Sequence, residues 1–206
     1  LLVLVLIIGS FCTVLNGTLL STALPSIMRS FNISTATAEW LSTAFLLVNG
    51  VMIPISAWLI NRFGSRKMYL SAMSIFFIGT VIAAIAPNFG TLLVGRIIQG
   101  LGVGVTMPLL QTIMLSIFPA NKRGAAMGTV GIVIGLAPAI GPTLSGWIVD
   151  NLSWRYLFSI IAPIAGIVII LAFFLIKDVL PTKKEKIDVW SVITSTLGFG
   201  SLLYGF

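Results

Sequence analysis

The chain has 206 residues, of which 58% are hydrophobic and only 8% are charged, and its formal net charge is +7. Soluble domains carry roughly 25% charged residues, so this composition excludes an ordinary water-soluble fold. The hydrophobic residues form long runs, and nearly all charges fall in the gaps between them, which is the pattern of helices that cross a lipid bilayer.

Six complete hydrophobic runs are close to or above the roughly 20 residues that a helix needs to cross the bilayer. We predict membrane spans at about residues 1–23, 40–60, 68–86, 90–117, 124–149 and 155–176. A basic cytoplasmic linker is expected at 177–189, and residues 190–206 begin a seventh span. The expected fold class is therefore all-α, a polytopic transmembrane helical bundle of six helices followed by the start of a seventh.

The chain begins at Leu1 inside one hydrophobic run and ends at Phe206 inside another. We therefore expect the N-terminal portion of a longer protein, whose C-terminal half would complete the bundle. The first run continues to Pro25 without a cleavage site, which argues against a signal peptide.

Basic residues concentrate in alternate loops. The loops around the ends of the second, fourth and sixth spans contain Arg62, Arg66, Lys67, Lys122, Arg123, Lys177, Lys183, Lys184 and Lys186. The opposite loops contain only Arg29 and Arg155. By the positive-inside rule, this bias predicts a multi-pass protein of the cell membrane with its N-terminus and basic loops in the cytoplasm. No nucleic-acid partner is expected, because the positive charge is divided between loops and does not form one basic face.

The sequence contains signs of an internal repeat. The segment 57–61 at the end of the second span resembles 146–150 at the end of the fifth. Asn16 and its neighbours in the first span match Gln99 and its neighbours in the fourth. The 57–61 and 146–150 segments face opposite sides of the membrane, so we predict a 3+3 inverted repeat. This arrangement is typical of secondary transporters, whose sites lie near the midplane where the repeats meet.

Arg96 is the one charged residue well inside a predicted span. A charge near the centre of an isolated span costs about 2.5–3.5 kcal/mol on insertion scales, so this side chain should face a cavity or a hydrogen-bonded cluster. We expect it to act as a fixed positive charge that couples proton movement or attracts part of a substrate. The alternative is a structural brace for neighbouring carbonyl groups.

Four amide side chains also lie at membrane depth. They are Asn16 in the first span, Asn49 in the second, and Gln99 and Gln111 in the fourth. Gln99 is one helical turn from Arg96 and near the same face. Amides in a membrane either hydrogen-bond across helices or line a cavity, and both interpretations stay open.

Catalysis is poorly supported by the residue types present. Histidine is absent, and the five acidic residues lie in loops or at the edges of spans. No general base is placed at depth, and no cluster of ligands could hold a metal ion. We therefore expect neither an enzyme nor a protein that needs a metal or another cofactor.

The fifth span is rich in residues that alter helix packing, namely Gly131, Gly135, Pro138, Gly141 and Pro142. Glycine lets a neighbouring backbone approach closely, and proline removes a backbone donor and tends to bend a helix. We expect a pliant helix at an interface that rocks during transport. The alternative is static close packing.

A short basic turn joins the second and third spans and contains Asn61, Arg62, Gly64, Arg66 and Lys67. Its positive charges could serve only to set the topology. A second interpretation is a latch that places cations against the carbonyl ends of helices and against an acid, and so holds one conformation.

Four segments resemble motifs of the major facilitator superfamily. They are 15–25, similar to the first-helix motif of its fourteen-span drug:proton antiporter branch; 57–67, similar to its loop 2–3 motif; 95–102, similar to its fourth-helix motif; and 131–142, similar to its fifth-helix antiporter motif. The segments occur in the family's order, and the likeness covers nearly the whole chain. It implies the N-terminal six-helix half of a major-facilitator fold.

The resemblance also implies a bacterial exporter of hydrophobic or cationic drugs, driven by the proton gradient and similar to multidrug and lincosamide exporters. Its other partners would be the lipid bilayer and protons. Two positions depart from the pattern, because the family commonly has an acid at or beside Asn16 and an aspartate at Asn61. The open alternatives are an importer of the same fold and a non-transporting membrane sensor or scaffold.

Overall fold

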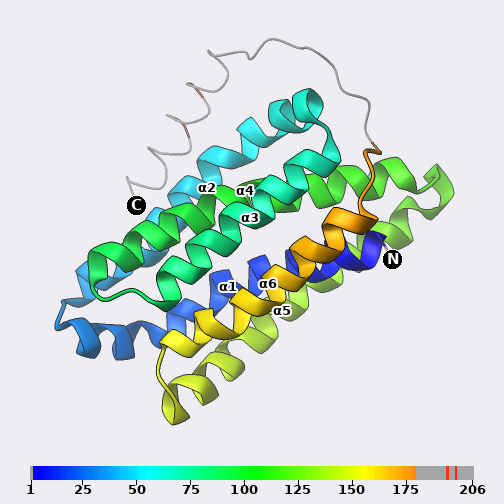
Figure 1. Cartoon of the computed structure of the whole chain (residues 1–206). Helices are drawn as coiled ribbons and strands as arrows, with labels where there is room; N and C mark the ends of the chain where they lie inside the picture. The colour runs from blue at the N-terminus through cyan, green and yellow to red at the C-terminus, as the bar shows by residue number, and fades with distance from the viewer. Residues whose placement is uncertain (1, 180–193, 195–197, 199–206) are drawn as a thin grey trace.

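The computed structural model describes residues 2–179 together with 194 and 198. The described chain forms six long helices, shown in Figure 1: α1 (Leu2–Phe31), α2 (Thr35–Phe63), α3 (Ser65–Ala84), α4 (Phe89–Ile117), α5 (Arg123–Asn151) and α6 (Arg155–Leu175). A short 3-10 turn, η1 (Ala120–Lys122), precedes α5. All six helices are long and apolar enough to cross a membrane. Most of the expected linker and seventh span lies outside the described residues.

The first two helices extend several residues beyond the hydrophobic runs that predict them. The first helix continues to Phe31, past the end expected near residue 23, with Pro25 inside it. The second begins at Thr35, where the Ser34 side chain accepts a hydrogen bond from the backbone N–H of Thr37 at 3.3 Å. Side-chain caps of this kind satisfy donors that the first helical turn leaves free.

Gly64 alone connects α2 to α3. Its φ of 83° lies in the left-handed region, which glycine adopts without a steric penalty. Its backbone N–H donates to the carbonyl oxygen of Ile60 at 3.0 Å and closes the last turn of α2. The chain therefore reverses within one residue, and the basic residues on either side of the turn stay close together.

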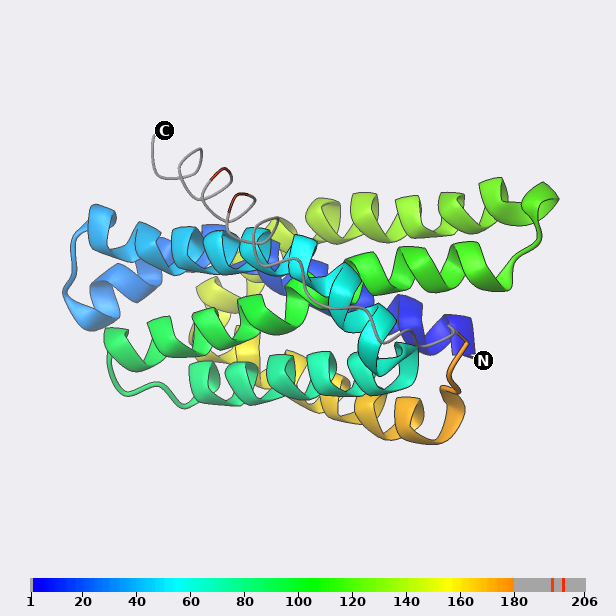
Figure 2. The same cartoon turned by 90° about the horizontal axis from the view of Figure 1, so that it is seen from above.

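The helix contacts follow the predicted repeat, in which α1, α2 and α3 match α4, α5 and α6. The second helix packs mainly on α4, and in the matching way α5 packs mainly on α1. The two third helices, α3 and α6, pack on each other, and α3 also lies along α4. Because the loops alternate between the two ends, α2 and α4 run in the same direction, as do α1 and α5, whereas α3 runs antiparallel to α4 and to α6 (Figure 2). Helices α2 and α3 touch each other only slightly.

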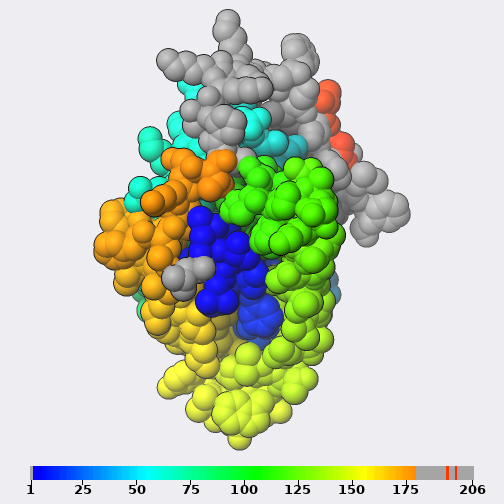
Figure 3. Space-filling view, turned by 90° about the vertical axis from the view of Figure 1, so that its right-hand side faces the viewer, coloured from blue at the N-terminus to red at the C-terminus, as the bar shows by residue number. Residues whose placement is uncertain are grey.

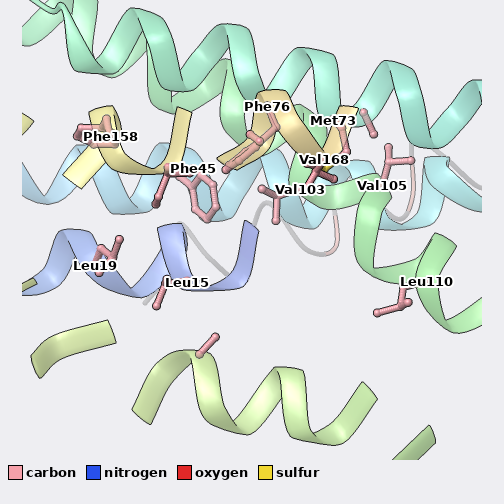
Figure 4. Close-up of a cluster of buried hydrophobic side chains, with 14 of the residues drawn as sticks. Leu15, Leu19, Phe45, Met73, Phe76, Val103, Val105, Leu110, Phe158 and Val168 are labelled. Atoms are coloured by element: carbon pink, nitrogen blue, oxygen red, sulfur yellow. The ribbon is translucent and has the colours of Figure 1, made fainter. Parts of the chain in front are cut away.

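Hydrophobic side chains from all six helices form the core. Figure 4 shows part of this core, including Leu15 of α1, Phe45 of α2, Phe76 of α3 and Val103 of α4. The outer faces remain hydrophobic as well, and Phe174 of α6 is 75% exposed. A surface of this kind is suited to lipid rather than to water.

The loops alternate between the two ends of the bundle. The N-terminus of α1, the α2–α3 turn, the α4–α5 connection and the end of α6 share one end, on the right of Figure 1. Figure 3 looks onto that end and shows the first turns of α1 between α6 and the α4–α5 connection. This end carries most of the positive charge. Which side of the membrane it faces stays a prediction from the charge bias.

The contact between α3 and α4 leaves no room for a side chain at Gly79. A Cβ atom there would lie 2.7 Å from the backbone nitrogen of Gln99. We therefore expect Gly79→Ala to lower the unfolding free energy of the full-length protein by about 1–3 kcal/mol through overpacking.

Thermal denaturation in detergent measures this effect. Gly128→Ala is the matched control, because nothing lies within 4 Å of a Cβ at that position. Equal melting temperatures for the two variants would show that α3 and α4 are not packed this closely.

Candidate functional site

Arg96 lies fully buried in the bundle. It follows Phe89, the first residue of α4, by seven residues, which places it about 10 Å along the helix. Its Nη1 donates to Asn16 Oδ1 of α1 at 2.7 Å and to Gln99 Oε1 at 2.9 Å. Its Nε donates to the carbonyl oxygen of Leu41 in α2 at 3.4 Å. One side chain therefore connects three helices.

Gln99 extends these hydrogen bonds to a fourth helix. Its Nε2 donates to Thr80 Oγ1 of α3 at 2.8 Å, and the Thr80 hydroxyl donates to the carbonyl oxygen of Phe76 at 2.7 Å. Because the Gln99 oxygen accepts from Arg96 while its nitrogen donates to Thr80, the amide has one satisfied orientation. We name Asn16, Thr80, Arg96 and Gln99 the Arg96 cluster.

The repeat explains why two amides meet on one guanidinium. Asn16 and Gln99 occupy matching positions in the first helices of the two repeats, α1 and α4. Both accept a hydrogen bond from Nη1 of Arg96. The cluster therefore lies where the two repeats meet, which is the region where secondary transporters place their sites.

Within residues 2–179, neutral groups alone compensate the charge of Arg96. The acids of this part of the chain, Glu39, Asp150 and Asp178, are all exposed. The guanidinium carbon lies 4.1 Å from the centre of the Phe45 ring. Hydrogen bonds to a charged group contribute about 1.5–3 kcal/mol each, and a desolvated cation–π contact contributes about 2 kcal/mol. Together these contacts offset the insertion cost of one charge.

Phe45 also forms part of the wall of a cavity of about 330 Å³ between α1, α2 and α4. The cavity is lined by Thr13, Val14, Gly17, Thr18, Phe45, Leu46, Asn49, Ile53, Val103, Met107 and Pro108. None of these side chains is charged, and Arg96 is not among them. The Phe45 ring therefore separates the guanidinium from the cavity.

The structure divides the predicted amides between these two environments. Asn16 and Gln99 are buried in the Arg96 cluster. Asn49 lines the cavity. Gln111 is half-buried farther along α4 and belongs to neither.

The predicted basic turn contacts the end of α6. Arg66 Nη2 donates to the carbonyl oxygen of Phe173 at 2.7 Å, and its guanidinium lies 5.5 Å from the Phe173 ring centre. The Asp178 carboxylate, beyond α6, accepts from the backbone N–H of Arg66 at 2.9 Å and from Ser65 Oγ at 3.5 Å. A cation thus lies against helix carbonyls and an acid lies against a helix N-terminus, where each is favoured.

The other residues of the turn are less enclosed. Arg62 lies 5.3 Å from the Trp58 ring centre and 5.9 Å from that of Phe63. Asn61 and Lys67 are exposed. The turn therefore presents positive charge and aromatic surface at this end of the bundle.

A matching arrangement occurs at the opposite end. Arg155, which the repeat matches to Arg66, donates from Nη2 to the carbonyl oxygen of Ala86 just beyond α3, at 2.9 Å. Its guanidinium lies 4.4 Å from the Trp154 ring centre, and Trp154 Nε1 donates to Ser30 Oγ at 3.1 Å. Each arginine connects the start of one third helix to the end of the other. These contacts lie within one half of the fold, and a latching role in transport stays a prediction.

The glycines and prolines of α5 divide between its two faces. Gly141 is buried, and a Cβ there would overlap the Thr18 hydroxyl of α1. The residues on the exposed side are Gly131, Gly135, Pro138 and Pro142. Nothing lies within 4 Å of a Cβ at Gly131 or Gly135. The exposed face is therefore open to lipid or to the rest of the protein.

Three residues that contribute to the site were not predicted from the sequence, namely Thr80, Phe45 and Asp178. Thr80 could have been found as a hydroxyl at membrane depth, but hydroxyls are common there. Phe45 carries no signal, because a phenylalanine in an apolar run is expected simply to pack. Asp178 stood out only as an acid in a basic linker.

Thr80→Val tests the hydrogen bond between Gln99 and Thr80, which connects the Arg96 cluster to α3. Valine keeps the shape of threonine but cannot accept the Gln99 hydrogen bond, so a buried N–H loses its partner. We expect the unfolding free energy of the full-length protein to fall by about 1–3 kcal/mol.

The readout is the thermal midpoint in detergent. Thr129→Val is the control, because the exposed Thr129 hydroxyl bonds only to Ala125 O within α5 at 3.2 Å. Midpoints that fall equally in both variants would contradict the cluster.

Comparisons with known proteins agree with this fold. The chain is 58% identical over 202 residues to the uncharacterized MFS-type transporter YcnB of Bacillus subtilis, covering 98% of this chain and 43% of YcnB. It is 42% identical over 201 residues to the lincomycin resistance protein LmrB of the same organism, covering 98% and 42% of the two chains. It is 32% identical over 207 residues to the multidrug export protein EmrB of Haemophilus influenzae, covering 98% and 40%. The chain thus spans less than half the length of these relatives.

Solved structures share the fold at low sequence identity. A peptide transporter POT matches with a TM-score of 0.78 and 13% identity, covering 98% of this chain and 44% of that one. The human organic anion transporter MFSD10 matches with a TM-score of 0.77 and 17% identity, covering 94% and 52%. The sequence profile of the Major Facilitator Superfamily matches residues 6–205. This chain therefore belongs to the Major Facilitator Superfamily.

Proposed function

We propose that the complete protein is a secondary exporter of hydrophobic compounds in the bacterial plasma membrane, driven by proton re-entry. In this proposal the six described helices form one half of an alternating-access transporter. The remaining half closes the central cavity, and substrate leaves when the two halves rock against each other. The observation that carries the proposal is the apolar cavity against Phe45, with the Arg96 cluster directly behind it.

The lining of the cavity supports a hydrophobic substrate. Its walls are apolar except for the hydroxyls of Thr13 and Thr18 and the amide of Asn49. An apolar pocket with a few placed polar groups binds small molecules mainly by shape and burial. The described wall offers no carboxylate to pair with a cationic drug, so the remaining half would have to recognise a cation.

The proposed direction rests on the relatives. Lincomycin resistance and multidrug export, the activities in the names of LmrB and EmrB, both fit removal of compounds from the cell. The positive charge at the end of the bundle with the N-terminus supports a cytoplasmic position for that end. Substrate would then enter from the cytoplasm or the inner leaflet.

The proposed coupling assigns Arg96 the role of a fixed charge. Because the described helices hold no acid at depth, the group that takes up and releases the proton would lie in the remaining half. The cation fixed by Asn16 and Gln99 would favour the ionised form of such an acid when the halves approach. Each proton that re-enters would supply about 2.3 kcal/mol per 100 mV of membrane potential.

Everted membrane vesicles that contain the full-length protein test this function. With an acidic lumen, we expect lincomycin to cause proton release that raises the lumenal pH. Arg96→Ala should abolish the release, and Arg96→Lys, which keeps the charge but loses the paired contacts, should retain part of it. Arg29→Ala is the control, because Arg29 is exposed and its side chain bonds to Pro25 O within α1.

Each alternative has its own outcome in this assay. Lincomycin accumulation that ignores the proton gradient would refute the coupling. Faster net entry into intact cells that make the protein would indicate an importer. Saturable binding without flux would indicate a sensor or scaffold.

Asn49→Leu tests the cavity as the substrate site. It removes an amide from the wall and keeps a side chain of similar size, so a substrate that hydrogen-bonds there loses about 0.5–1.5 kcal/mol. We expect the half-saturating lincomycin concentration in the vesicle assay to rise about 2–10-fold.

Gln111→Leu is the matched control, because Gln111 lies on α4 outside the cavity lining. Equal half-saturating concentrations for the wild type and both variants would place the substrate elsewhere.

A further inference from the structure

A second cavity, separate from the proposed substrate site, lies between α2, α3 and α4. Its volume is about 440 Å³. Met52 and Phe63 of α2, Ser71 and Ile75 of α3 and Val105 of α4 line it, and Lys67 lies at one end. It exists because α2 and α3 touch only slightly while both pack on α4. We name it the α2–α3 groove.

The length of the groove matches one leaflet of a bilayer. The α2 wall runs from Phe63 back to Met52, which is about 16 Å at 1.5 Å per residue. Half of the hydrocarbon core of a bilayer is about 15 Å. The groove therefore begins at the membrane surface, beside the α2–α3 turn, and ends near the midplane.

The groove has room for an extended hydrocarbon chain. Its volume is about 440 Å³, and it follows α2 for about 16 Å. Its walls are mainly apolar side chains of α2, α3 and α4, which suit an acyl chain.

The surface end of the groove carries two cations. Lys67 is an exposed residue in the first turn of α3, and it is the one charged side chain among the described lining residues. Arg62 lies 5.9 Å from the ring centre of Phe63, which lines the same end. A long basic side chain at this depth places its stem along apolar surface and its charge among the headgroups. The mouth of the groove therefore favours an anionic headgroup over a neutral one.

We propose that the α2–α3 groove binds one acyl chain of an anionic phospholipid from the leaflet at this end of the bundle. Lys67 contacts the headgroup phosphate, with Arg62 beside it. The wall from Phe63 to Met52 contacts the acyl chain. The site is separate from the proposed substrate site, because none of its described lining residues belongs to the Arg96 cluster or to the substrate cavity.

Native mass spectrometry of the full-length protein tests the site, using equal amounts of phosphatidylglycerol and phosphatidylcholine as the probe lipids. We expect one phosphatidylglycerol to be retained preferentially. Lys67→Gln should lower this preference about fivefold, the effect of one basic residue near the headgroups. Lys122→Gln, which removes an exposed charge from the same end, should leave the preference unchanged.

Ser71→Phe tests the acyl chain by filling the groove, and Ser71→Ala keeps it open. We expect Ser71→Phe to abolish the preferential retention and Ser71→Ala to preserve it. If Ser71→Phe fails to fold, as judged by gel filtration, Ile75→Trp replaces it, because Ile75 is already partly exposed. A phosphatidylglycerol with a photoreactive acyl chain should label peptides from 52–75 in the wild type.

Three outcomes would overturn the proposal. Equal losses from Lys67→Gln and Lys122→Gln would show only a general attraction of lipid to positive charge. Undiminished retention in the folded groove-filling variant would place the lipid elsewhere. A wild-type protein that retains no lipid and shows no label in 52–75 would show that another part of the protein covers the groove.

Discussion

The guanidinium of Arg96 takes its hydrogen-bond acceptors from three helices at once, and this requirement constrains the packing of the first four helices. Asn16 brings α1 to the charge, Leu41 brings α2, and Gln99 passes the connection to Thr80 of α3. A charge with such partners tolerates little displacement, because losing one acceptor leaves a buried donor unsatisfied. The relative positions of the first four helices therefore depend on one side chain.

The inverted repeat accounts for how the chain meets this requirement. One amide from each repeat reaches the same nitrogen of Arg96, and one arginine from each repeat connects the two third helices at opposite ends of the bundle. The same duplication leaves α5 packed on α1 with an open glycine face, and α2 packed on α4 beside a groove. Arginine hydrogen bonds therefore hold helices together at the centre and at both ends of the bundle. The exposed face of α5 and the α2–α3 groove remain accessible along its sides.

Sequence patterns predicted the six helices, the repeat and the depth of Arg96, because length, hydropathy and charge placement are local properties. They predicted the helix ends less well, since Ser34 and similar caps extend helices into polar sequence. The same patterns could not predict which amides belong to the Arg96 cluster and which line the cavity. Asn16 and Asn49 look alike in sequence, yet Asn16 accepts a hydrogen bond from Arg96 and Asn49 lines the cavity. That difference depends on helix rotation and on Phe45, a residue without a polar signal.

A double-mutant cycle between Asn16 and Arg96 measures the central interaction most directly. The unfolding free energies of the wild type, Asn16→Ala, Arg96→Met and the double variant would be determined for the full-length protein in bicelles. We expect the sum of the two single-variant losses of unfolding free energy to exceed the loss in the double variant by about 1–2 kcal/mol, because both substitutions remove the same hydrogen bond. Losses that add within about 0.5 kcal/mol would contradict it.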